Sequence, residues 1–81
     1  MAWEETIIQV REMHLRARCA ELSADYHIAV NEYLRCLEAA EVAADLRATW
    51  FFAAKLAQVY GAMGFADKAT RYRELVAFAA G

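Results

Sequence analysis

The amino-acid sequence predicts an all-α fold. The 81 residues include no proline and only three glycines, so few positions interrupt a helix, and the chain is rich in the helix formers alanine, leucine, glutamate and arginine. Apolar residues recur every three or four positions, which is the spacing of one helix face, and no stretch alternates as a strand does. Because a chain of this length forms at most one domain, we assign residues 1–81 to a single helical domain.

Four helices are expected, at residues 3–22, 25–43, 45–63 and 65–80. The first is predicted from helix propensity, and the other three from apolar periodicity. The periodic positions are Tyr26, Ala29, Val30, Tyr33, Leu37 and Ala40 in the second helix, Leu46, Trp50, Ala53, Leu56, Val59, Tyr60 and Met63 in the third, and Ala69, Tyr72, Leu75, Val76 and Ala79 in the fourth.

The breaks between helices are marked unequally. Gly64 can adopt the left-handed conformation that ends a helix, and Asp67 can support the start of the next one. Ser23 or Asp25 can cap a helix that starts near residue 26. Between the second and third helices only Asp45 offers a cap, so one continuous helix over residues 25–63 is an alternative, and with it a three-helix bundle with a long central helix.

An internal repeat supports paired helices. Residues 25–37 align with residues 65–77, which places Ala29 on Ala69, forty residues apart, and a period of this length is typical of stacked helical hairpins. The first hairpin would span residues 1–43 and the second residues 44–81. At Ala57 and Ala69, small side chains would let neighbouring helices approach closely.

At these positions the sequence resembles the tetratricopeptide repeat family. The second half carries the likeness: Leu56 and Ala57 match a Leu-Gly pair, Tyr60 the tyrosine of the first helix, Gly64 the turn glycine, Ala69 the close-contact alanine and Tyr72 an aromatic of the second helix. The first half departs from the pattern, since Arg16, Ala20 and Glu41 stand where leucine, tyrosine and proline are expected. The resemblance implies two degenerate repeats, with Arg11, Arg18, Lys55 and Gln58 as candidate partner-binding residues on the first helix of each pair.

Three consecutive aromatic residues, Trp50, Phe51 and Phe52, are further candidates for partner binding. They cannot all face one core, because successive helical residues differ by about 100° around the axis. We expect Trp50 to face the hairpin core and Phe51 or Phe52 to pack on the first or second helix. The alternative is that one of them anchors a partner or dimer contact.

Several function classes find no support in the sequence. A net charge of −2 gives no basic field for nucleic acid, and no apolar run is long enough to cross a membrane. Cys19 and Cys36 are expected to be buried free thiols. His14 and His27 lack a second ligand at helical spacing, so no metal, cofactor or catalytic residue is predicted. Without a signal-peptide pattern we expect a cytoplasmic location.

The sequence therefore predicts a non-enzymatic protein-interaction module. Its 60% hydrophobic composition is more than so short a chain easily buries, so we expect an adaptor or chaperone-like subunit that binds a partner segment or forms a homo-oligomer. One alternative is a structural homo-oligomeric bundle without a peptide groove, since residues 24–40 also resemble the microtubule-interacting and trafficking domain. Another is a bundle that encloses a small apolar ligand or a metal.

Overall fold

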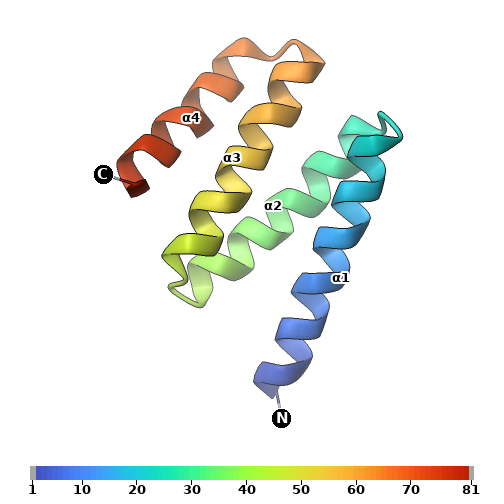
Figure 1. Cartoon of the computed structure of the whole chain (residues 1–81), viewed down its shortest axis with the longest axis vertical. Coiled ribbons are helices and arrows are strands. Elements are labelled where there is room, and N and C mark those ends of the chain that lie inside the picture. Colours follow the sequence, from blue (N-terminus) through green and yellow to red (C-terminus); the bar gives the residue numbers. More distant parts are fainter. Residues whose placement is uncertain (1, 81) are drawn as a thin grey trace.

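A computed structural model describes residues 2–80, and the side-chain environments of residues 8–78. Over this range the chain forms four α-helices, α1 (Ala2–Leu22), α2 (Tyr26–Val42), α3 (Leu46–Met63) and α4 (Ala66–Ala80), and no strand (Figure 1). The predicted all-α fold is confirmed. The alternative of one helix over residues 25–63 is wrong, because α2 ends at Val42 and α3 begins at Leu46.

The three turns share one geometry. Ala24, Ala44 and Gly64 each adopt a positive φ, of 60°, 54° and 86°. In each turn the next N–H donates to a carbonyl five residues earlier, which is the hydrogen bond of the Schellman motif. These bonds are Asp25 to Ala20 at 2.8 Å, Asp45 to Ala40 at 3.0 Å and Phe65 to Tyr60 at 2.9 Å. The left-handed residues are therefore spaced every twenty positions, so the helix and its turn repeat as a unit.

The starts of α2 and α3 differ. A carboxylate oxygen of Asp45 accepts a hydrogen bond from the Ala48 N–H at 3.1 Å, as expected for a capping residue. Asp25 occupies the same position before α2, but its side chain makes no capping hydrogen bond. The expected side-chain cap on α2 is therefore wrong. The backbone differs accordingly, since ψ is 68° at Asp25 and 95° at Asp45.

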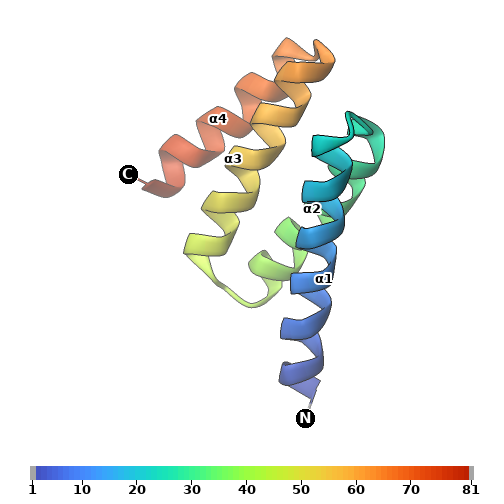
Figure 2. The same cartoon turned by 45° about the vertical axis from the view of Figure 1, so that its right-hand side comes forward.

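The helices pack in chain order and form a thin layer. α2 packs against α1 and α3, and α4 packs against α3 (Figures 1 and 2). The Cα atoms extend over 41 × 32 × 13 Å, so the helices form a single staggered layer. Most domains bury their elements between two layers, and here α1 and α4 remain open edges.

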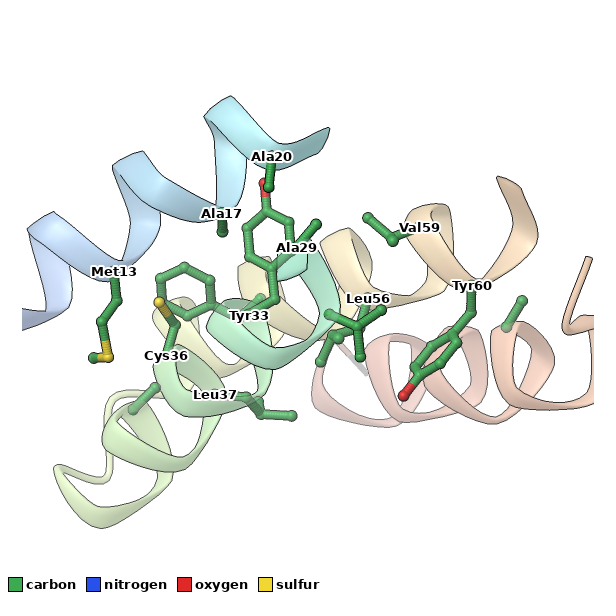
Figure 3. Packing of buried hydrophobic residues seen from close by; sticks show 14 residues of the cluster. Met13, Ala17, Ala20, Ala29, Tyr33, Cys36, Leu37, Leu56, Val59 and Tyr60 are labelled. Carbon is green, nitrogen blue, oxygen red and sulfur yellow. The ribbon is translucent and has the colours of Figure 1, made fainter. Parts of the chain in front are cut away.

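Small side chains line the helix crossings. Ala17, Ala29, Ala53 and Ala69 have no exposed surface, which allows the helix backbones to approach closely. Larger side chains fill the space between these contacts (Figure 3). The largest fully buried ones are Tyr33, Leu56, Val59 and Cys36.

Tyr33 joins α2 to α1 by a polar contact at the edge of this core. Its hydroxyl donates a hydrogen bond to a carboxylate oxygen of Glu21 at 2.8 Å. Burial of the ring, followed by the hydrogen bond to Glu21, raises the pKa of Tyr33 well above its usual range. Tyr33 therefore stays protonated and holds the carboxylate of Glu21 in place.

Candidate functional site

A half-exposed phenylalanine joins α1 to α3 on one face of the layer. Phe51 is 43% exposed, and its ring centroid lies 5.3 Å from that of His14 in an edge-on arrangement. The ammonium nitrogen of Lys55 lies 5.9 Å from the centroid of the same ring, within cation–π range. The ring thus contacts side chains from two helices, of which Lys55 is cationic, and still reaches the surface.

Helical spacing extends this surface along both helices. Arg11, His14 and Arg18 recur at three- and four-residue steps on α1, and Phe51, Lys55 and Gln58 do so on α3. α3 carries no aspartate or glutamate. We call this surface the basic face, and its residues are Arg11, His14, Arg18, Arg47, Phe51, Lys55 and Gln58. The basic face carries four of the nine arginine and lysine side chains of a chain whose net charge is −2.

His14 is neutral at neutral pH. Burial lowers its pKa below the ordinary value of 6.5, and the positive charges of Lys55 and Arg18 lower it further. The neutral ring packs on Phe52 as well, with centroids 5.5 Å apart. The charge of the basic face therefore comes from arginine and lysine, and His14 supports Phe51.

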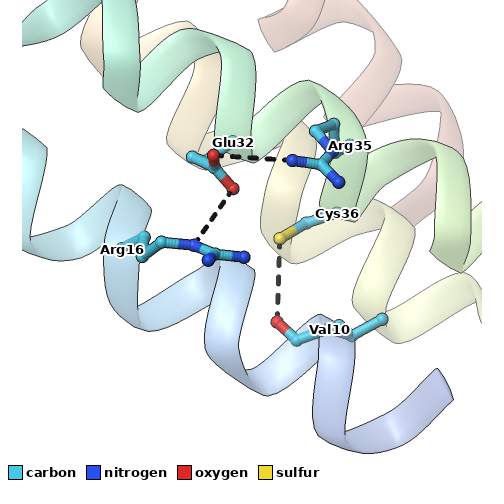
Figure 4. A network of polar contacts seen from close by, with 5 residues as sticks. All are labelled: Val10, Arg16, Glu32, Arg35 and Cys36. Carbon is cyan, nitrogen blue, oxygen red and sulfur yellow. Dashed lines mark hydrogen bonds and ion pairs between the residues drawn. The ribbon is translucent and has the colours of Figure 1, made fainter. Parts of the chain in front are cut away.

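The salt bridges between residues 8–78 lie elsewhere. The Glu32 carboxylate forms a salt bridge to Arg16 of α1 at 3.7 Å and a second one, within α2, to Arg35 at 3.6 Å (Figure 4). Glu21 follows Arg18 by three residues, but Tyr33 occupies one of its carboxylate oxygens. Arg18 and Lys55 thus form no salt bridge within this part of the chain, and both remain available to an external carboxylate.

The aromatic run agrees with the prediction in part: Phe51 and Phe52 pack on α1 and α2 as expected, whereas Trp50 does not face the core. Trp50 was expected to face the core, yet it is 46% exposed, whereas Phe52 is only 5% exposed. Phe52 contacts the Tyr33 ring, with centroids 6.4 Å apart, and so belongs to the core rather than to a partner-binding surface. The reason is register: the side of α3 that meets α1 and α2 contains Phe52, Leu56 and Val59, and Trp50 lies off that side.

The residues matched to repeat positions surround the junction of α3 and α4. Ala57 and Ala69 are buried there, as Ala29 is in α2, and Gly64 forms the turn. Tyr60 and Tyr72 stack with centroids 5.7 Å apart and planes at 11°. Burial raises the pKa of Tyr72. This cluster fixes α4 on α3 and lies apart from the basic face.

The cysteines and other polar groups do not assemble a reactive centre. Cys19 is exposed, contrary to expectation, while Cys36 is buried and donates a long hydrogen bond to the Val10 carbonyl at 3.9 Å. Burial raises the pKa of the Cys36 thiol to about 11, which makes it a poor nucleophile. Among the described residues no three His, Cys, Asp or Glu side chains gather as metal ligands.

An open groove lies between α1 and α2. It has a volume of about 580 Å³ and is lined by both charge signs, including Glu12, Arg16, Arg35 and Glu38. Its open shape and charged lining do not suit an apolar ligand. In the described part of the chain, none of the helices combines the length and apolar character that crossing a bilayer requires.

Comparison with known proteins yields no match among family models, curated proteins or solved structures. The resemblance to the tetratricopeptide repeat family therefore stays a prediction. Of its implied partner-binding residues, the structure brings Arg18 and Lys55 together at His14. Sequence reasoning missed His14 itself, although its spacing from Arg11 and Arg18 places the three on one side of α1.

Proposed function

We propose that this chain is a non-enzymatic interaction module, acting as an adaptor or chaperone-like subunit, whose basic face binds an acidic segment of a partner protein. The observation that carries the proposal is the half-exposed ring of Phe51 between His14 and Lys55. Exposed aromatic side chains often anchor protein interfaces, and the neighbouring cation of Lys55 adds a charged contact for a partner.

The positive charges of the basic face favour a partner segment that is acidic. A segment with aspartate or glutamate beside an apolar side chain would place its carboxylates near Arg18 and Lys55 and its apolar group on Phe51. Arginine binds carboxylates through paired hydrogen bonds, and opposite potentials favour encounter and register. The absence of acidic residues from α3 supports an acidic partner over a basic one.

The proposal agrees with the resemblance to tetratricopeptide repeats, which would place the binding surface on the first helix of each pair. Those helices are α1 and α3, and both contribute to the basic face. We therefore keep membership of this family as part of the proposal. The charge argument does not depend on it.

The test is calorimetric titration with a short synthetic peptide of glutamate and leucine, and with a control peptide in which lysine replaces glutamate. We expect the acidic peptide alone to bind, and Phe51→Ser or Lys55→Glu to weaken binding about tenfold or more. Trp50→Ser is the matched control, because Trp50 is equally exposed at 46% but lies outside the basic face.

Two results would contradict the proposal. One is equal loss of peptide binding in Trp50→Ser and Phe51→Ser. The other is binding of a single-stranded oligonucleotide, lost in Lys55→Glu, without binding of the acidic peptide. Circular dichroism melts of each variant separate loss of binding from loss of folding.

A further inference from the structure

The open edge of α1 carries a row of aliphatic side chains at seven-residue spacing. Ile8, Leu15 and Leu22 are 56%, 57% and 79% exposed. Successive helical residues differ by about 100°, so these three lie opposite the side on which Met13 and Ala17 are buried. α1 forms one edge of the layer, with its far side uncovered in both views (Figures 1 and 2).

The spacing indicates what fits this row. A row of apolar residues at seven-residue spacing runs nearly parallel to the helix axis, so it fits a second helix packed lengthwise, and it fills one of the two core positions of each heptad. An extended peptide would instead match alternate residues along a strand. A row of three side chains makes a small contact, of the size found in weak, reversible association.

The charges beside the row indicate which helix fits. Arg11 and Arg18 lie on one flank of the row, and Glu12 lies on the other. In a parallel pair related by a two-fold axis, Arg11 of each copy lies beside Glu12 of the other copy. An antiparallel pair would place Arg11 of one copy beside Arg18 of the other, which is repulsive.

We propose that α1 binds the α1 helix of a second copy in parallel, with Ile8, Leu15 and Leu22 each meeting its own counterpart. A two-fold contact of this kind uses the same surface on both chains and closes at a dimer. On the opposite edge of the layer, α4 exposes a separate apolar pair, Leu75 and Phe78. Arg11 and Arg18 lie between the row and His14, on which Phe51 packs, so the two surfaces are neighbours on α1. The inference does not rest on the proposed function.

Sedimentation equilibrium at high micromolar concentration tests the contact. We expect the unmodified chain to dimerise and Leu15→Asp to weaken dimerisation about tenfold or more, because it places two carboxylates against each other. The control is Ile28→Asp on α2, where the side chain is similarly exposed at 54%, and it should dimerise normally. Leu15→Ser removes the same apolar contact without adding a charge beside Arg11 and Arg18. It should also weaken dimerisation but retain binding of the acidic peptide, which separates the two surfaces.

A monomeric unmodified chain over this concentration range would overturn the proposal. Equal loss of dimerisation in Leu15→Asp and Ile28→Asp, or the same loss in Phe78→Asp, would also overturn it. Thermal melts of the variants verify that each one folds.

A disulfide experiment tests the parallel orientation. In a Cys19→Ser background, Leu22→Cys should form a dimer on treatment with oxidised glutathione, which accepts the two electrons and two protons lost by the two thiols. Cys36 is buried and Ile28→Cys in the same background is the control, which should stay monomeric. No Leu22→Cys dimer, combined with a disulfide between Ile8→Cys and Leu22→Cys chains, would show an antiparallel pair and overturn the proposal.

Discussion

The turn between α3 and α4 and the turn between α2 and α3 have the same backbone but different sequences. Gly64 and Ala44 both adopt the left-handed conformation, and each is followed by a hydrogen bond back to the preceding helix. Glycine adopts this conformation freely, whereas alanine is strained there. The comparison teaches that helix packing and backbone hydrogen bonds impose the turn, even where the residue opposes it.

The largest expected change in stability comes from enlarging the residue five positions after each left-handed turn residue. Ala69 is fully buried against α3, where a Cβ placed on Gly61 would lie 4.0 Å from its own Cβ. We expect Ala69→Leu to destabilise the fold by about 1–3 kcal/mol through overpacking. Thr49, the equivalent residue after the Ala44 turn, is only half-buried, so Thr49→Leu should change stability less. Denaturant unfolding measures the stability of both variants. Equal losses of stability would show that the helices pack equally closely after the two turns.

Exchanging the turn residues tests the strain itself. Gly64→Ala should lower the free energy of unfolding by about 1 kcal/mol, and this is a pure backbone effect because no atom lies within 4 Å of the added Cβ. Ala44→Gly should raise it by about 0.5–1 kcal/mol, since the relieved strain exceeds the entropy cost of glycine. Chemical denaturation measures the two variants side by side. Destabilisation by Ala44→Gly would contradict the strain account.

The capping residues offer a matched pair. Asp45 accepts a hydrogen bond from the Ala48 amide, whereas the side chain of Asp25 makes no such bond. Asp45→Ala should therefore lower the free energy of unfolding by about 1 kcal/mol, and Asp25→Ala by only a few tenths of a kcal/mol. Thermal melts of the two variants at one pH make the comparison. A larger loss of stability in Asp25→Ala than in Asp45→Ala would contradict the assignment of the capping hydrogen bond to Asp45 alone.

The smallest effect is the pH dependence from His14. Its pKa is lowered in the folded chain, so the unfolded chain binds protons more readily, and stability should fall as the pH drops below 6.5. The loss is complete below the folded-state pKa. His14→Gln should flatten this slope in unfolding curves recorded from neutral pH downwards. A slope unchanged by the substitution would show that other groups cause it.

Much of the fold follows from local sequence. Apolar periodicity and the lack of breakers predict the helices, and Gly64 marks the end of α3. The end of α2 stayed ambiguous because Ala44 is a good helix former, and its strained conformation depends on tertiary packing. For the same reason the capping role of Asp25 could not be judged without its backbone angles.

The candidate site was predictable only in part. Spacing places Arg11 and Arg18 on one side of α1, but only packing brings Lys55 and Phe51 to His14. Periodicity could not decide which of three consecutive aromatics is buried, since that depends on where α1 crosses α3. For this reason Trp50 is half-exposed where burial was expected, whereas Phe52 packs on α1 and α2 as predicted.

The most direct test of the central claim is to map the backbone amide shifts of the labelled chain by NMR while the glutamate and leucine peptide is added. The proposal predicts saturable shifts concentrated at His14, Arg18, Phe51, Lys55 and Gln58, which weaken as salt is raised. Shifts centred on Trp50 and Leu46, or on the open edge of α1, would contradict it.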